Sequence, residues 1–119
     1  MADKAYKEVQ FDFKDKDGRR YIFDKENFSN HLLKHPELLR EDFTERIKKA
    51  IIEPTCIYPA YKSKGLFCYY YEEFTFEGTT RYTKVVVRKT KYCYIIITAF
   101  RPTNIKETQY FKEPLWERP

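Results

Sequence analysis

Four strand-like runs follow one another in the second half of the chain, and they constrain the fold more than any other feature. The runs are rich in aromatic and β-branched residues, which favour extended backbone. The links between them are of turn length, too short for crossover connections, so neighbouring runs should pair antiparallel. The sequence therefore predicts a four-stranded antiparallel meander made of residues 56–61, 66–74, 81–88 and 92–100.

The N-terminal residues predict a β-hairpin. Apolar and polar residues alternate over 6–13, which is typical of a strand with one buried side. Asp17 and Gly18 then form the kind of dipeptide that supplies a positive φ in a tight turn. Residues 19–23 would return as the second strand.

Two helices are predicted between the hairpin and the meander. Asp24 would cap the first, which should run to about residue 34 because Pro36 disfavours helical backbone just before it. The second should begin near Asp42 and end at Pro54. Its buried stripe follows helical spacing and consists of Phe43, Ile47, Ala50 and Ile51.

These elements predict an α+β fold, in which an N-terminal β-hairpin and two helices pack on the four-stranded antiparallel meander. A length of 119 residues fits a single domain. Its core should span about 24–101, with 1–23 as an extra hairpin and 102–119 as an irregular tail. Trp116 is a candidate for attaching that tail to the body.

Charge and composition favour an anionic partner. The formal net charge is +5, and the segment 81–101 contains six basic residues and no acidic residue. A local basic field of this kind can steer a polyanion such as RNA, although a solvated hairpin can also carry it. Three glycines are too few for a glycine-rich phosphate loop. No cofactor is indicated.

The three cysteines and the apolar runs bear on location. Cys56, Cys68 and Cys93 each lie in an apolar or aromatic run without C-x-x-C spacing, which favours buried free thiols over a metal site. The N-terminal residues lack the apolar region of a signal peptide, and no apolar run is long enough to span a bilayer. We expect no membrane association and a cytoplasmic location.

His31 and His35 are the only histidines, and they are four residues apart on the first predicted helix. Imidazole can transfer a proton near neutral pH, so the pair could act as general base and acid. Both could equally be structural histidines bonded to nearby carbonyls. A zinc site is disfavoured because no third ligand is evident.

Residues of the last two predicted strands could contact phosphate. Tyr82, Lys84 and Arg88 alternate along one strand and should project from one face. Phosphate could lie between the two cations, or they could form a solvent-facing stripe. Thr98 and Arg101 end the next strand, where they could orient a phosphate and neutralise its charge.

The loop between these two strands decides whether Thr98 shares the face of Lys84. A three-residue loop of 89–91 places Thr98 opposite Tyr82, on the Lys84 face, whereas a two-residue loop places it on the other face. The loop contains neither Gly nor Asn, which favours the longer form.

The order of several short motifs resembles the barnase–EndoU–colicin–RelE-like nuclease superfamily, in its phage-associated branch. The similarity extends from about residue 28 to 101, nearly two thirds of the chain, and depends on the order of motifs more than on any one of them. The motifs are N-H-L-L-K-H-P-E at 30–37, I-I-E-P-T-C-I at 51–57, K-V-V-V at 84–87 and I-T-A-F at 97–100.

The resemblance implies metal-independent cleavage of RNA, in which the 2′-hydroxyl attacks the adjacent phosphate and leaves a 2′,3′-cyclic end. His31 or His35 would be the general base or acid, Lys84 would hold or protonate phosphate oxygens, and Thr98 would orient the scissile phosphate. Charge, rather than the motifs, adds Arg88 and Arg101 as substrate contacts, with Arg81 and Tyr82 beside them.

The sequence therefore supports three functional hypotheses. The first is an endoribonuclease acting on tRNA or mRNA, which could be a toxin controlled by an antitoxin or immunity protein. The second is a non-catalytic RNA-binding module whose tyrosines stack on unpaired bases. The third is a structural or regulatory protein-interaction domain.

Overall fold

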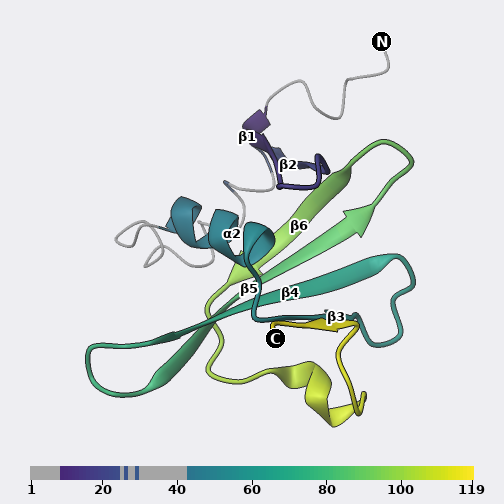
Figure 1. Ribbon diagram of the computed structural model, residues 1–119. Coiled ribbons are helices and arrows are strands. Elements are labelled where there is room, and N and C mark those ends of the chain that lie inside the picture. The colour runs from purple at the N-terminus through teal and green to yellow at the C-terminus, as the bar shows by residue number, and fades with distance from the viewer. Residues whose placement is uncertain (1–8, 25, 27–28, 30–42) are drawn as a thin grey trace.

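A computed structural model describes residues 9–24, 26, 29 and 43–119 of the chain. It contains a seven-stranded sheet in the order β1-β2-β6-β5-β4-β3-β7 (Figure 1). The strands are β1 (Val9–Lys14), β2 (Arg20–Asp24), β3 (Cys56–Pro59), β4 (Leu66–Phe74), β5 (Thr80–Lys89), β6 (Tyr94–Phe100) and β7 (Trp116–Glu117).

The predicted four-stranded antiparallel meander with two packed helices is wrong as a fold class. The pairs β3–β4, β4–β5 and β5–β6 are antiparallel, but β2 pairs parallel with β6 and makes the sheet mixed. The reason lies in β2, where Tyr21, Ile22 and Phe23 are all at most 1% exposed. A strand buried on both faces cannot remain in a separate hairpin and is paired inside the sheet instead.

Among the described residues, one α-helix has both of its ends defined, α2 (Phe43–Ile52). The prediction for this helix is confirmed, since Phe43, Ile47, Ala50 and Ile51 form its buried stripe. It covers the face of the sheet formed by β4 and β5. Nearly all of the first predicted helix, 24–34, lies outside the described residues.

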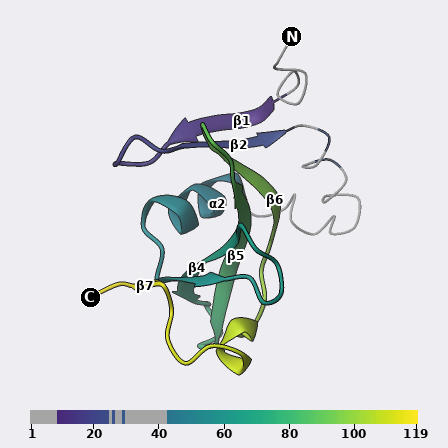
Figure 2. The same ribbon diagram turned by 90° about the vertical axis from the view of Figure 1, so that its right-hand side faces the viewer.

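The two faces of the sheet carry separate cores. On the face of α2, the helix stripe packs on Tyr21, Tyr69, Val85, Val87 and Ile96. On the opposite face the core contains Cys56, Tyr58, Cys68 and Tyr70. The segment after β6 covers that second core, with Ile105 and Phe111 packed against it and the 3-10 helix η3 (Lys106–Gln109) lying below the sheet (Figure 2).

The C-terminal segment is therefore more ordered than an irregular tail. It begins where the Pro102 carbonyl accepts a hydrogen bond from the Tyr82 backbone N–H, and it ends in β7, which pairs with β3. Trp116 lies in that strand opposite Ile57, but its side chain is 43% exposed. Strand pairing, rather than burial of the indole, holds the end of the segment.

The β5–β6 connection differs from both predicted registers. Lys89 pairs with Tyr94, so the loop has four residues, and Thr98 lies opposite Val86 rather than Tyr82. A bulge intervenes, because Val87 pairs with Ile96 while Val86 pairs with Thr98, which leaves Ile97 as the extra residue. Because of the bulge, Thr98 pairs with Val86, which lies on the same face of β5 as Lys84. Thr98 therefore shares the face of Lys84, as the longer predicted loop required.

The predicted Asp-Gly turn is confirmed, with Gly18 at a φ of 84° between β1 and β2. Cys56, Cys68 and Cys93 are free and buried, as expected. No helix in the described part of the chain is both long and apolar enough to cross a membrane.

Candidate functional site

The two histidines lie outside the part of the chain that the structure describes. His31 and His35 both fall within 30–42. Their assignment as general base and acid therefore stays a prediction.

Lys84 lies in a buried cluster of polar groups beneath the C-terminal segment. Its Nζ donates to Glu107 Oε2 at 2.8 Å, and the two residues are 7% and 5% exposed. The Tyr70 hydroxyl donates to the other oxygen of the same carboxylate, and the Cys68 thiol lies 3.7 Å from Oε2. The Lys84 ammonium also lies 5.4 Å and 5.6 Å from the ring centres of Tyr70 and Phe100. Glu107 thus occupies the position in which sequence reasoning expected phosphate.

The electrostatics of this cluster favour the ion pair. Burial alone would raise the pKa of Glu107, but hydrogen bonds from Lys84 and Tyr70 outweigh it and hold the pKa below its ordinary value. Burial and the neighbouring carboxylate raise the pKa of the Tyr70 hydroxyl, which therefore remains a donor. Burial raises the pKa of the Cys68 thiol to about 12, so this thiol is not a nucleophile at neutral pH.

The other predicted contacts lie along the same strands but do not form one site. Thr98 is half-buried on the Lys84 face, and Tyr82 packs edge-on against Tyr70 with ring centres 6.0 Å apart. Arg81 donates to the Arg101 carbonyl, while Arg101 Nη2 bonds Glu73 Oε1 at 3.0 Å. Of the predicted cations only Arg88 is exposed, at the opposite end of β5.

Two neighbouring loops and the end of β5 carry five exposed basic side chains at that end of the sheet. The β3–β4 loop contributes Lys62 and Lys64, the end of β5 contributes Arg88 and Lys89, and the β5–β6 loop contributes Lys91. The loops are in contact, since Leu66 pairs with Arg88 and the Lys89 backbone N–H donates to the Gly65 carbonyl at 3.2 Å. We call these five residues the basic loop end; it lies on the right in Figure 1.

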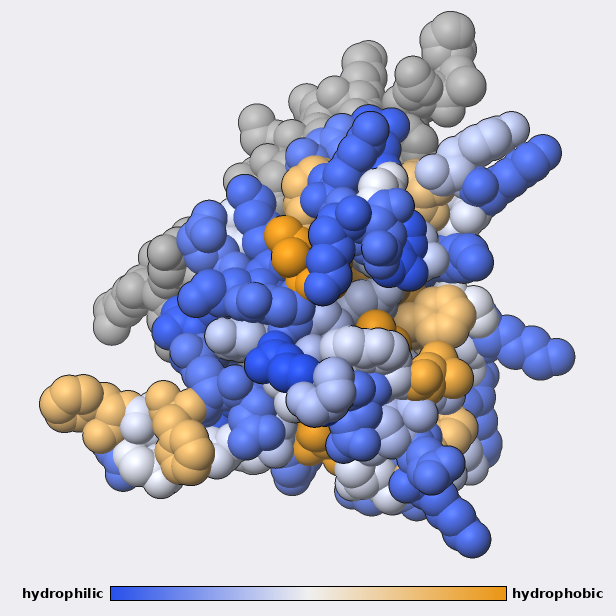
Figure 3. Space-filling model, in the orientation of Figure 1, coloured by the Kyte–Doolittle hydropathy of each residue, from blue (hydrophilic) through white to orange (hydrophobic). Residues whose placement is uncertain are grey.

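The charges of the basic loop end are not neutralised locally. All five side chains are exposed, none forms an ion pair with a described residue, and neither loop contains an acidic residue. Long hydrophilic side chains project from this side of the molecule (Figure 3). Five like charges at one end of the sheet favour a polyanion, because each phosphate they bind also releases condensed counterions.

Exposed tyrosines accompany these cations. Tyr92, at the tip of the β5–β6 loop, is 83% exposed, and Tyr61 and Tyr110 are 46% and 42% exposed. The rings of Tyr61 and Tyr110 stack on each other with centres 3.8 Å apart. Lys62 and Lys91 lie over the rings of Tyr61 and Tyr92 at 5.4 Å and 5.5 Å. Exposed aromatic rings thus lie beside two of the cations of the basic loop end.

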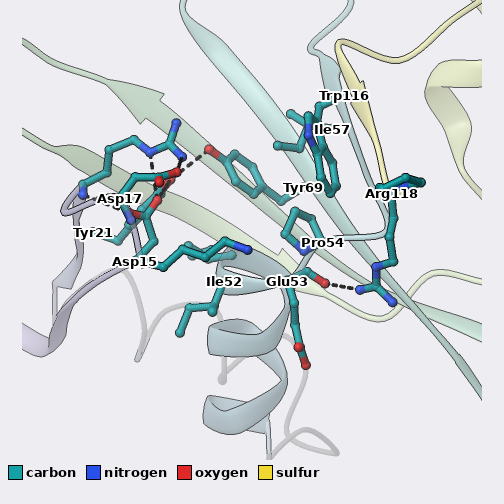
Figure 4. A pocket seen from close by; sticks show the side chains of 14 residues that line it. Asp15, Asp17, Tyr21, Ile52, Glu53, Pro54, Ile57, Tyr69, Trp116 and Arg118 are labelled. Carbon is teal, nitrogen blue, oxygen red and sulfur yellow. Dashed lines mark hydrogen bonds and ion pairs between the residues drawn. The ribbon is translucent and has the colours of Figure 1, made fainter.

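A pocket of about 510 Å³ lies on the α2 side, between the β1–β2 turn, the end of α2 and β7 (Figure 4). Ile57, Pro54 and Trp116 form an apolar wall that faces the ring of Tyr69. The hydroxyls of Tyr69 and Tyr21 bond each other at 2.9 Å. At the turn, Asp15 and Asp17 are both paired with Arg19. The lining carries three acidic and three basic side chains, so the pocket lacks the charge surplus of a phosphate site.

Sequence reasoning missed Glu107, the two lysines of the β3–β4 loop and the pocket. Glu107 is a lone carboxylate in a segment without periodicity, so no local pattern indicates its burial. Lys62 and Lys64 could have been found, because two lysines within a short turn adjoin the strand that pairs with the basic segment 81–101. The described residues contain no group of three or more His, Cys, Asp or Glu side chains that could hold a metal ion.

Comparisons with protein-family models, with curated proteins and with solved structures find no match for this chain. The nuclease resemblance therefore stays an expectation drawn from the motifs, and the function is inferred from the chemistry of the site.

Proposed function

We propose that the protein binds single-stranded RNA through the basic loop end. The observation that carries the proposal is the group of five exposed cations on two adjoining loops and the end of β5, with no acidic residue in either loop. The phosphates of a strand would neutralise these cations in sequence. Three free thiols and an RNA partner both fit the reducing environment of the cytoplasm, where we expect the protein to act.

The tyrosines favour a single strand over a duplex. An unpaired base can stack on an aromatic ring, whereas the bases of a duplex are already stacked on one another. Tyr92 offers an exposed ring beside Lys91, and the Tyr61–Tyr110 pair offers a second platform. Because every base has a π-face, we expect weak sequence preference.

Binding of a fluorescently labelled single-stranded RNA, followed by anisotropy, tests the proposal. The variant Lys62→Ala/Lys89→Ala should weaken binding by about tenfold or more at low salt, because each cation removed leaves one phosphate without its partner. The matched control is Lys14→Ala/Lys49→Ala, which removes the same charge from β1 and α2. Equal loss of affinity in the two variants would mean that net charge, and not the basic loop end, binds RNA.

A metal-independent ribonuclease of the toxin type, controlled by an antitoxin, is the second candidate. One observation favours it: the bulge in β6 brings Thr98 to the Lys84 face, as the mechanism implied by the motifs requires. Cleavage would also require Glu107 to leave Lys84, since the carboxylate holds the position of the phosphate. In this mechanism the 2′-hydroxyl attacks phosphorus while a histidine accepts its proton, and the 5′-oxygen leaves as it is protonated.

Cleavage of tRNA or a model mRNA in the presence of EDTA separates the two candidates. A ribonuclease should yield 2′,3′-cyclic phosphate ends with the wild type and lose this activity in His31→Ala or His35→Ala. The binding module should leave the RNA intact while retaining salt-sensitive affinity.

A further inference from the structure

The large hydrophobic side chains exposed among the described residues fall into three groups. Tyr61, Tyr92 and Tyr110 accompany the basic loop end. The other two groups contain no tyrosine and lie elsewhere: one at the turn between β4 and β5, the other at and beside the pocket. Their members are Phe74 and Phe76 in the first, and Ile52, Leu115 and Trp116 in the second.

The first of these groups forms a projecting knob. Phe74 and Phe76 are 73% and fully exposed, and they lie where the long β4–β5 hairpin extends from the body (Figure 1). In the same orientation, Figure 3 shows an apolar projection at this end. The turn is well formed, since Gly78 adopts a φ of 83° and Thr75 and Thr79 are joined by backbone and hydroxyl hydrogen bonds. An ordered turn presents the two rings to solvent at a fixed position.

The second group surrounds a cavity of suitable chemistry. The pocket of about 510 Å³ has an apolar wall, and Ile52 and Trp116 extend that wall to the surface with 37% and 43% of their side chains exposed (Figure 4). This volume readily admits a phenyl ring. Exposed apolar patches that are not balanced by charge commonly mark interaction sites.

The knob cannot enter the pocket of its own molecule. Tyr69, which lines the pocket, precedes Phe74 by five residues on β4, a separation of about 16 Å along an extended strand. The hairpin continues away from the pocket, so a contact between the two surfaces must join two molecules. Such a contact uses different surfaces on each copy, and it is therefore heterologous.

The charges around the knob and the pocket favour a second copy of this chain over anionic lipid or RNA as the partner. Residues 72–80 contain three glutamates and no basic residue; Glu73 is paired with Arg46 and Arg101, which leaves Glu72 and Glu77 beside the phenyl rings. These carboxylates oppose anionic lipid and RNA. At the pocket, Asp15 and Asp17 are paired with Arg19, and the Arg118 guanidinium donates to the Glu53 carbonyl, whereas Lys16 forms no ion pair with a described carboxylate. The acidic knob thus fits a pocket in which the Lys16 ammonium has no carboxylate partner among the described residues.

We propose that the β4–β5 hairpin tip of one copy docks in the pocket of a second copy, with Phe76 in the apolar cavity and Glu77 toward Lys16. The contact leaves the basic loop end uncovered. A head-to-tail contact of this kind links copies in a row and leaves one free tip and one free pocket at the ends of the row.

Sedimentation velocity over a concentration series tests the docking. The wild type should associate, while Phe74→Ser/Phe76→Ser and Ile52→Glu should each remain monomeric, with the dissociation constant raised more than about tenfold. The matched control is Tyr92→Ser, which removes an exposed aromatic ring from a different loop and should associate like the wild type. Circular dichroism checks that each variant is folded.

The decisive experiment is to mix the pocket variant with the tip variant, each of which is monomeric alone. The Ile52→Glu protein keeps its tip and the Phe74→Ser/Phe76→Ser protein keeps its pocket, so the mixture should form a 1:1 dimer that cannot extend into a row. A wild type that stays monomeric throughout the series, tip variants that associate like the wild type, or a mixture that does not pair would each overturn the proposal. So would a monomeric wild type that binds lipid vesicles through Phe76.

Discussion

Lys84 and Lys89 lie five residues apart on β5, and their surroundings assign them opposite roles. Lys84 is 7% exposed and its ammonium is bonded to Glu107, with two aromatic rings beside it. Lys89 is exposed, and none of the ion pairs of the described residues includes it. One strand therefore supplies both an internal ion pair and part of an open basic surface.

The difference shows that the location of a cation decides what it can bind. A buried ammonium must have its counter-charge within the fold, because an unpaired charge in the interior costs several kcal/mol. An exposed ammonium keeps its hydration and can exchange counterions for a phosphate. Two cations that look equivalent in the sequence thus contribute to stability in one case and to recognition in the other.

The largest effect should come from breaking the buried pair. Lys84→Met leaves the Glu107 carboxylate buried without its cation, which should lower the free energy of unfolding by about 3–5 kcal/mol. Lys89→Met, a matched change in the exposed position, should alter it by no more than about 0.5 kcal/mol. Urea denaturation measures both values, and equal effects would contradict the comparison.

Acid should weaken the same cluster by a smaller amount. The folded-state pKa of Glu107 lies below its ordinary value near 4.5, so its contribution to stability is complete above that value. The contribution is lost as the pH falls through the lowered folded-state pKa, because the proton then competes with Lys84. Unfolding measured between about pH 6 and pH 2 should therefore show a loss of stability that is reduced in Glu107→Gln. Identical pH profiles would contradict this assignment.

Removing exposed cations should change recognition and leave stability unaltered. Arg88→Ala/Lys89→Ala should lower RNA affinity by about tenfold, and the slope of log affinity against log salt should fall by about 0.7 for each phosphate that is no longer neutralised. The Lys84→Met protein, assayed where it is folded, should keep the wild-type slope. A reduced slope in Lys84→Met would mean that the buried cation reaches RNA.

The smallest effect should follow from removal of one stacking ring. Tyr92→Ala should reduce RNA affinity by about fivefold, at the lower limit of a base–aromatic stack. The conservative variant Tyr92→Phe keeps the ring and should bind like the wild type. If Tyr92→Phe is as weak as Tyr92→Ala, the hydroxyl and not the ring binds the RNA.

Local patterns predicted the elements better than their assembly. The stripe of Phe43, Ile47, Ala50 and Ile51 correctly located α2, and the Asp-Gly dipeptide correctly located the first turn. The parallel pairing of Tyr21 with Tyr94 joins residues 73 positions apart (94 minus 21), and nothing near either residue indicates it. Burial of β2 in the finished sheet decides that pairing.

The candidate site shows the same limit. Alternation predicted that Lys84 and Arg88 share a face, but burial of the first depends on η3, which lies beyond the predicted core. The shared face of Thr98 depends on one bulged residue, Ile97, which no turn signal reveals. The basic charge of the last two strands was visible in the sequence, whereas the contribution of the β3–β4 loop required the register of β4 with β5.

Acetylation of lysines with and without single-stranded RNA, with each site quantified by mass spectrometry, tests the central claim most directly. RNA should protect Lys62, Lys64, Lys89 and Lys91 from acetylation and leave the reactivity of Lys14 and Lys49 unchanged. Lys84 should be unreactive with and without RNA, because it is buried against Glu107. Protection of Lys14 and Lys49 with no change in the two loops would contradict the account. Reactivity of Lys84 that disappears when RNA binds would contradict it equally, because it would place the RNA beneath the C-terminal segment.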